Sequence, residues 1–305
     1  MKKEIRMLAL GLCLCMLMTL NGCDTSTYAA SDEIIIEAKR LAEYIGQEGV
    51  VIVDMQAEED YAAAHVPGAV NIPVGSVLVN LPVENMLASK GKITGVLSGA
   101  GIGNDTRVVI YDEGRSLNAS RLWWSMLVYG KDDVKVVNGG MPAIQRAGIE
   151  MTDSLPEVVP AEFTATDRKG DYTADMRAVR AKADDPREGV ILLDTRSNQE
   201  YLDEGKIPGA MMIDYMNNFY KDGTLINTQA ARINYIEKGV RAESEVILYC
   251  RTSMRAAVTF LRLYDAGYRN LKIYDGAWVE WTASGANPVD MPTGANPAAT
   301  VRDGS

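Results

Sequence analysis

Short runs of apolar and β-branched residues alternate along the chain with stretches of helical periodicity. The runs that we predict as strands are Val50–Val53, Val108–Tyr111, Val134–Val137, Val190–Leu193, Val246–Tyr249 and Leu271–Tyr274. Because they are almost continuously apolar, they are typical of strands buried on both faces of a parallel sheet. Amphipathic stretches such as Arg255–Ala266 supply the helices. The pattern predicts an α/β fold with mainly parallel central sheets that carry helices on both faces.

The same order of short motifs occurs twice in the chain. VVIVDMQAEEDYAAAHVPGAVNIP (50–73) aligns with VILLDTRSNQEYLDEGKIPGAMMID (190–214), and VVIYD (108–112) aligns with VILYC (246–250). Further on, VVNGG matches IYDGA. A motif order repeated in this way indicates a duplicated domain.

Composition places the boundaries between the predicted domains. We expect a first domain at 34–150 and a second at 172–290. The segment 151–171 between them contains two prolines and no clear apolar periodicity, so we predict a surface linker there. The last residues, 291–305, are small, polar and rich in proline and glycine, which predicts a flexible tail.

The N-terminus reads as an export signal. A basic start is followed by an unbroken apolar run of 14 residues, Met7 to Leu20, which is short for a membrane span. The run ends in Leu-Asn-Gly-Cys, which resembles a bacterial lipoprotein cleavage box. That resemblance implies removal of residues 1–22 and a lipid on Cys23. We therefore expect an exported protein, anchored by lipid to the outer face of the bacterial cytoplasmic membrane or on its periplasmic side.

Charge and cysteine count narrow the possible partners and chemistry. Without the leader, the chain carries 28 basic and 40 acidic residues, a net charge of −12, which argues against a nucleic-acid partner. Cys13 and Cys15 would leave with the leader and Cys23 would carry lipid, so Cys250 would be the only thiol. One histidine, His65, and one thiol cannot assemble a metal site of the usual kind.

The setting of Cys250 favours a reactive thiolate. It directly follows the strand run Val246–Tyr249 and directly precedes a helix, and in α/β sheets ligands bind beyond the carboxyl ends of strands. The loop amides can form an anion-binding nest, and the helix presents its positive N-terminal end. Arg251 and Arg255 add permanent positive charge. Such surroundings predict a nucleophile rather than a structural cysteine.

These motifs resemble those of the tandem-domain rhodaneses, the thiosulfate and 3-mercaptopyruvate sulfurtransferases. The resemblance covers roughly 34–290 and rests on DTRSNQEY followed by KIPGA, then YCRTSMR and YDGAWVEW. It implies two tandem rhodanese-like domains. It also implies that Cys250 takes sulfane sulfur from a small anionic donor as a persulfide and passes it to a thiophilic acceptor such as cyanide or a thiol. No cofactor is expected.

By the same resemblance, the loop after the cysteine binds the donor. This assigns five residues to substrate binding: Arg251, Thr252, Ser253, Met254 and Arg255. Alternatives stay open for all five. Each arginine could instead be a solvated surface charge or part of an ion pair, the two hydroxyl residues could instead cap the helix, and the methionine could instead pack.

Arg196 is a further candidate for donor binding, or else it pairs with Asp194 or Glu200 as part of the scaffold. Glu200 stands where 3-mercaptopyruvate enzymes often have a substrate-binding arginine. Arg251, directly after the cysteine, resembles the thiosulfate-preferring members. We therefore place thiosulfate ahead of 3-mercaptopyruvate and leave both open.

Spacing separates this chemistry from that of cysteine phosphatases, which place five residues between cysteine and arginine. Here Cys250 and Arg255 enclose four, and Ala256 stands at the phosphatase position. In the first half, Asp112 replaces the cysteine, so we expect that half to be inert and Asp112 to accept hydrogen bonds from loop amides.

Two functions from different classes remain. The first is a membrane-anchored sulfurtransferase with Cys250 as sulfur carrier. The alternative is a rhodanese-like lipoprotein that binds sulfide, persulfide or another protein without turnover. An intact loop with its nucleophile favours the enzyme, whereas an exported thiolate is at risk of oxidation, which favours the binding protein.

Overall fold

The computed structural model describes residues 28–29, 33–185 and 189–292. The predicted leader, the predicted lipidation site Cys23 and the tail from residue 293 on lie outside the described residues.

Two five-stranded, all-parallel sheets form the centres of the two halves. The first sheet, in the order β1-β7-β6-β2-β3, contains β1 (Ile35–Ile36), β2 (Val50–Asp54), β3 (Val70–Asn71), β6 (Arg107–Tyr111) and β7 (Val134–Val137). The second, in the order β10-β9-β11-β12-β8, contains β8 (Thr173–Ala174), β9 (Val190–Asp194), β10 (Met211–Met212), β11 (Glu245–Tyr249) and β12 (Leu271–Tyr274).

The six predicted strands are confirmed to within one residue at each end. Read from β8, the second sheet has the same chain order as the first read from β1, as a duplicated domain requires. The edge strands escaped prediction because each has two residues, too few to show a period. A small antiparallel pair, β4 (Leu78–Val79) with β5 (Met86–Leu87), projects from the first half.

Helices cover both faces of each sheet, as predicted. Those of the first half are η1 (Ala38–Glu43), α1 (Glu58–Ala63), η2 (Val74–Val77), α2 (Lys90–Gly99), α3 (Leu117–Val128) and α4 (Gly140–Arg146). Those of the second half are α5 (Lys169–Tyr172), α6 (Met176–Asp184), α7 (Asn198–Glu204), η3 (Tyr215–Asn218), α8 (Thr228–Ile236), α9 (Met254–Asp265) and α10 (Ala277–Ala283). One hydrophobic cluster joins η1 and α4 to the first sheet, and another joins α6 and α10 to the second.

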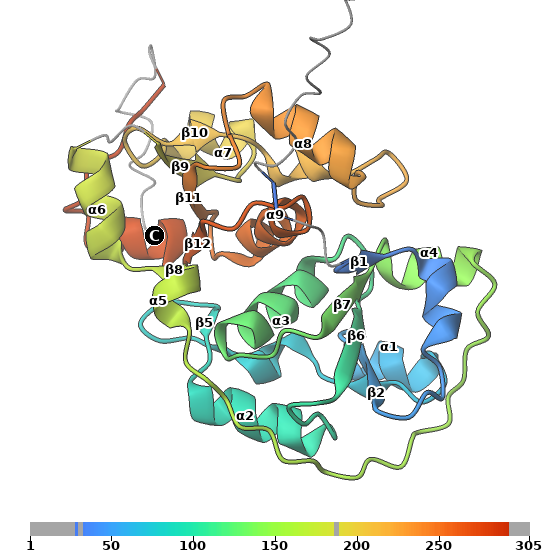
Figure 1. Cartoon of the computed structure of the whole chain (residues 1–305). Coiled ribbons are helices and arrows are strands. Elements are labelled where there is room, and N and C mark those ends of the chain that lie inside the picture. Colours follow the sequence, from blue (N-terminus) through green and yellow to red (C-terminus); the bar gives the residue numbers. More distant parts are fainter. Residues whose placement is uncertain (1–27, 30–32, 186–188, 293–305) are drawn as a thin grey trace, which may run out of the picture.

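The two halves pack together through α3 and α9, which lie against each other at the centre of Figure 1. One hydrophobic core runs across this contact and contains residues of both helices. Trp123 of α3 lies with its ring centroid 6.0 Å from that of Phe260 and 5.4 Å from that of Tyr264. The sheet that carries Cys250 is therefore held against the first half by a continuous apolar layer.

The connection between the halves runs across the surface of the first half (Figure 1). Its start is fixed by the bridge between Thr152 and His65, and its middle by the buried ring of Phe163. The predicted linker, 151–171, overlaps α5, which begins at Lys169. Just before it, the Asp167 carboxylate accepts a hydrogen bond from the Lys169 amide in a local turn.

Candidate active site

The loop that starts at Cys250 lies at the carboxyl end of β11, between β9 and β12. Two backbone hydrogen bonds fix it to the start of α10: the Trp278 amide donates to the Cys250 carbonyl at 3.0 Å, and the Val279 amide donates to the Arg251 carbonyl at 3.2 Å. Cys250 itself is 1% exposed. The thiol thus sits at the base of a loop whose backbone is held from one side.

Backbone amides in this loop lack acceptors. Within the described part of the chain, the amides of Arg251, Thr252 and Ser253 make no hydrogen bond. They precede α9, whose first turn also leaves amides without intrahelical partners. Free amides at a helix N-terminus are the ordinary binding site of an anion. This arrangement agrees with the anion-binding nest predicted from the sequence.

In the first half, a side chain fills the corresponding place. The Asp112 carboxylate accepts hydrogen bonds from the amides of Gly114, Asn118 and Ala119 at 3.0 to 3.1 Å. Burial and the nearby charge of Glu113 raise the pKa of Asp112 to about 7, although these three hydrogen bonds act in the opposite direction. The structure thus confirms Asp112 as the acceptor of loop amides.

Arg255, which closes the Cys250 loop, is bound by a carboxylate. Its two Nη atoms donate to the two oxygens of Glu200 at 2.6 and 2.7 Å. Burial acts to lower the pKa of Arg255, but hydrogen bonds and negative charge from Glu200, and the negative charge of Cys250, raise it above its ordinary value. The guanidinium is thus bound by the carboxylate and lies in the electrostatic field of the cysteine.

Glu200 is held in this position by its own helix. It is the third residue of α7 and forms a capping box with Ser197, whose amide donates to Glu200 Oε2 at 3.0 Å. Burial acts to raise the pKa of Glu200, but Arg255 and Ser197 outweigh it and lower the pKa to about 2. The carboxylate is charged at any physiological pH.

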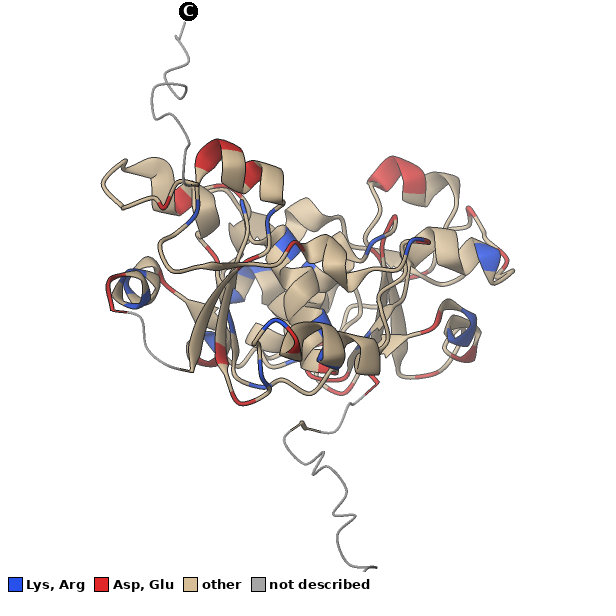
Figure 2. Ribbon diagram, turned by 90° about the horizontal axis from the view of Figure 1, so that it is seen from above, with Lys and Arg blue, Asp and Glu red and all other residues tan. Residues whose placement is uncertain are grey.

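A second carboxylate of α7 binds the other loop arginine. Arg251 Nη1 donates to both oxygens of Glu204, at 2.7 and 3.0 Å, in a more exposed pair. Glu200 and Glu204 are four residues apart and so lie on one face of the helix. The acidic residues of α7 are among those coloured red in Figure 2. Both arginines of the Cys250 loop, Arg251 and Arg255, are thus paired with carboxylates of α7.

Arg196 lies in the scaffold. It is fully buried, donates to both oxygens of Asp194 and to the Gly205 carbonyl, and stacks on Trp278 with its Cζ atom 4.1 Å from the ring centroid. Of the two roles open for Arg196, substrate binding and scaffold, this geometry favours the scaffold. It links the end of β9 to α10, and α10 in turn holds the Cys250 carbonyl.

The three remaining loop residues differ in their contacts. The Ser253 hydroxyl donates to the Tyr274 carbonyl at 2.6 Å, so it serves neither as a helix cap nor as a free donor. Met254 packs against the core shared by the two halves. The Thr252 hydroxyl has no partner within the described part of the chain and stays available.

Sequence reasoning placed Glu200 at this site but did not predict its ion pair with Arg255, and it did not single out Glu204. The signal was present in Ser-Asn-Gln-Glu (197–200), a capping-box pattern that puts Glu200 in the first turn of a helix. What the sequence could not provide was the distance from α7 to α9, since Glu200 and Arg255 are 55 positions apart.

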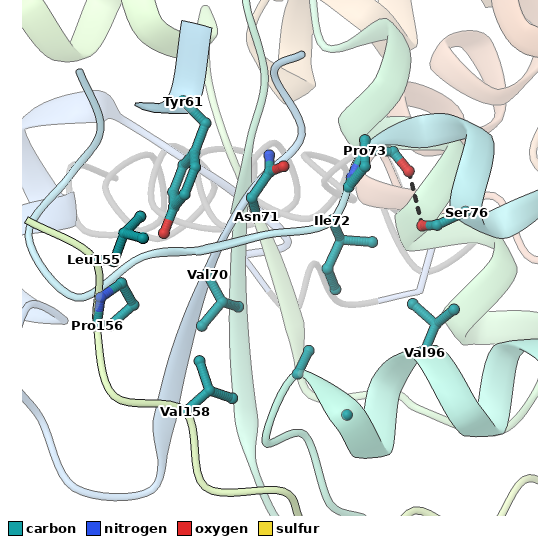
Figure 3. Close-up of a pocket in the computed structure, with 12 residues that line it drawn as sticks. Tyr61, Val70, Asn71, Ile72, Pro73, Ser76, Val96, Leu155, Pro156 and Val158 are labelled. Carbon is teal, nitrogen blue, oxygen red and sulfur yellow. Dashed lines mark hydrogen bonds between the residues drawn. The ribbon is translucent and has the colours of Figure 1, made fainter. Parts of the chain in front are cut away.

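A separate groove of about 390 Å³ lies on the first half (Figure 3). It is lined mainly by apolar groups of β3, α2 and the linker, such as Ile72, Val96 and Leu155, and has no charged side chain in its lining. No cluster of three metal-binding side chains occurs among the described residues.

Comparison with known proteins agrees with this architecture. The profile of the rhodanese-like domain matches residues 37–147 and 177–284. A putative thiosulfate sulfurtransferase of Haloferax volcanii is 30% identical over 259 residues, which cover 79% of this chain and 88% of that protein. The 3-mercaptopyruvate sulfurtransferase of Escherichia coli K12 is 27% identical over 285 residues, which cover 84% of this chain and 97% of that protein.

Solved structures show the same fold. SseA from Escherichia coli superposes with a TM-score of 0.71 at 25% identity, covering 80% of this chain and 98% of SseA. EanB superposes with a TM-score of 0.76 at 21% identity, covering 85% of this chain and 70% of EanB.

Proposed function

The chain belongs to the rhodanese-like family, and from that premise we propose that it is a sulfurtransferase that carries sulfane sulfur on Cys250. The observation that carries the proposal is the set of free amides of Arg251, Thr252 and Ser253 around a cysteine at a helix N-terminus. In the first half, the Asp112 carboxylate occupies such amides permanently. In the second half, a persulfide or the anionic group of a donor would take that place.

In the first step, the Cys250 thiolate attacks the outer sulfur of thiosulfate. A new S–S bond forms, the original S–S bond breaks, and sulfite leaves with the electron pair. In the second step, cyanide or a thiolate attacks the outer sulfur of the persulfide, and Cys250 leaves as a thiolate. Loop amides and the α9 N-terminus stabilise the anionic sulfur at both stages.

Thiosulfate is proposed ahead of 3-mercaptopyruvate as the donor. Glu200 stands where a cation for the 3-mercaptopyruvate carboxylate would be expected, and it is charged. Arg251 is half exposed beside the loop and would meet a small anion by exchanging it for its present partner, Glu204. Similar proteins of both kinds are known, one named for each donor.

Intact mass spectrometry tests this proposal. The purified chain is mixed with thiosulfate, and we expect a gain of one sulfur that disappears when cyanide is added. The Cys250→Ser variant should show no gain. A gain from 3-mercaptopyruvate but not from thiosulfate would reverse the order of donors.

The burial of Cys250 favours a second candidate function, a binding protein for sulfide, persulfide or a protein partner that does not turn over. It predicts no sulfur gain from either donor and no alkylation of Cys250 by iodoacetate. The two candidates thus differ in the same experiment.

We further propose that the protein is exported and anchored by lipid on Cys23. The leader pattern supports this proposal. Within the described ranges, no helix is long and apolar enough to cross a membrane. Labelling of cells with a radioactive fatty acid should mark the wild-type protein but not Cys23→Ser. Equal labelling of both would contradict the anchor.

A further inference from the structure

The Glu200 carboxylate binds the guanidinium of Arg255, the group that a donor anion would need. Both Nη atoms of Arg255 point to its two oxygens at 2.6 and 2.7 Å, in the parallel two-bond geometry that carboxylates and guanidinium groups prefer. The two side chains are 23% and 22% exposed, so solvent screens the pair only in part. The capping box with Ser197 orients the carboxylate before any ligand arrives.

Glu200 and, after it, the negative charge of Cys250 act to raise the pKa of Arg255, so the carboxylate and the cysteine influence the same cation. The second loop cation, Arg251, is bound by Glu204. Two positive and two negative groups therefore surround the loop, and an approaching anion meets no net positive charge from these four side chains.

We propose that Glu200 is a specificity-determining residue that acts as an internal competitor for the anionic group of the sulfur donor. This proposal rests on the proposed function of the same site. A donor anion must displace the Glu200 carboxylate from Arg255, so part of its binding energy is offset by the broken pair. A donor without an anionic group leaves the pair intact and bears no such cost. Glu200 therefore selects against small anions relative to neutral molecules of similar size.

The variant Glu200→Gln isolates the charge. Glutamine also forms a capping box with serine, so the start of α7 is retained while the competing negative charge is lost. The matched control is Asp203→Asn, on the same helix, where an exposed carboxylate contacts Gln199 rather than a loop arginine. Both variants change the net charge of the chain by the same amount.

Two alkylating reagents of similar size, one anionic and one neutral, test directly whether Glu200 selects against anions. Iodoacetate is an anion and iodoacetamide is neutral, and each reacts with a thiolate by forming an S–C bond and releasing iodide. Rates are followed at Cys250 of the full chain by peptide mass spectrometry. We expect the ratio of the iodoacetate rate to the iodoacetamide rate to rise about fivefold in Glu200→Gln and to stay unchanged in Asp203→Asn. The KM for thiosulfate should fall by a similar factor, with kcat changed less.

An unchanged or lower rate ratio in Glu200→Gln overturns the proposal. An equal rise of the ratio in Asp203→Asn also overturns it. The same holds if neither reagent alkylates Cys250 in the Glu200→Gln variant. The alkylation ratio does not depend on sulfur transfer. If the ratio rises but no donor transfers sulfur, the proposed function fails and the competition by Glu200 stands.

Discussion

At the scale of single residues, the partner of each arginine decides its role. Arg196 and Arg255 have the same side chain and both contact carboxylates, yet one is fully buried among Asp194, Gly205 and Trp278, while the other is partly exposed and pairs with Glu200. A buried, multiply bonded guanidinium cannot leave its partners without stranding a buried charge. Arg196 therefore holds the site together, and Arg255 remains available for exchange.

Replacing Arg196 by lysine tests this division. Lysine keeps the charge but cannot make the planar bonds to Asp194 and Gly205, so we expect the free energy of unfolding to fall by about 2 kcal/mol. The KM for thiosulfate should change less than about twofold, because the group does not touch the donor. Urea denaturation and steady-state kinetics measure the two effects.

The control is Arg107→Lys, in an exposed pair with Asp133, which should cost no more than about 0.5 kcal/mol. A tenfold rise in KM for Arg196→Lys, with stability unchanged, would instead assign Arg196 to the donor.

At the scale of elements, the same strand–loop–helix unit serves two purposes. Both α3 and α9 begin after a serine in the left-handed region, Ser116 with φ 53° and Ser253 with φ 63°. The loop before α3 is satisfied by Asp112, and the loop before α9 leaves its amides free. In one half of the duplication the loop amides are thus bound by a carboxylate, and in the other they make no hydrogen bond within the described structure.

Asp112 should make stability fall as pH rises. Its folded-state pKa of about 7 lies above its ordinary value of 3.8. Between these two pH values, the folded chain therefore holds a proton on Asp112 that the unfolded chain has lost. The free energy of unfolding should therefore decrease across this window, by at most about 1.4 kcal/mol per pH unit, and level off above pH 7.

Urea denaturation at a series of pH values measures this slope. In Asp112→Asn the slope should flatten, whatever the absolute stability of the variant, whereas the exposed control Asp105→Asn should keep it. An unchanged slope in Asp112→Asn would show that Asp112 does not titrate in this range.

At the scale of the whole molecule, polar contacts position one half against the other. Asp275, next to the Cys250 loop, accepts from the Leu87 amide at 2.6 Å and from Arg121 at 2.7 Å. Asn138, which aligns with Asp275 in the repeat, bonds the amide and carbonyl of Leu225. Each half therefore forms hydrogen bonds to the other through an equivalent position, in addition to the apolar contact of α3 with α9.

Asp275→Asn should strongly weaken the contact between the two halves. Arg121 is fully buried, and its Nε and Nη1 atoms have no hydrogen-bond partner in the described structure, so loss of the Asp275 charge leaves an uncompensated buried cation. We expect the free energy of unfolding to fall by about 3 kcal/mol, measured by denaturant titration.

The comparison is Arg107→Ala, which removes an exposed ion pair with Asp133 and should cost less than about 1 kcal/mol. A loss of the same small size in Asp275→Asn would mean that the charge does not join the halves.

The sequence by itself determined the strands, the duplication and the place of Cys250, because these depend on local apolar patterns and on motifs that repeat along the chain. It also indicated the inert first half, since Asp112 aligns with Cys250. Tertiary structure alone decided which carboxylate pairs with which arginine. It also decided that Arg196 is buried, while Arg255 is partly exposed and pairs with Glu200. These pairings join α7 to the Cys250 loop and α9 across about 50 positions of chain, and such distances follow from how helices pack on a sheet rather than from any local pattern.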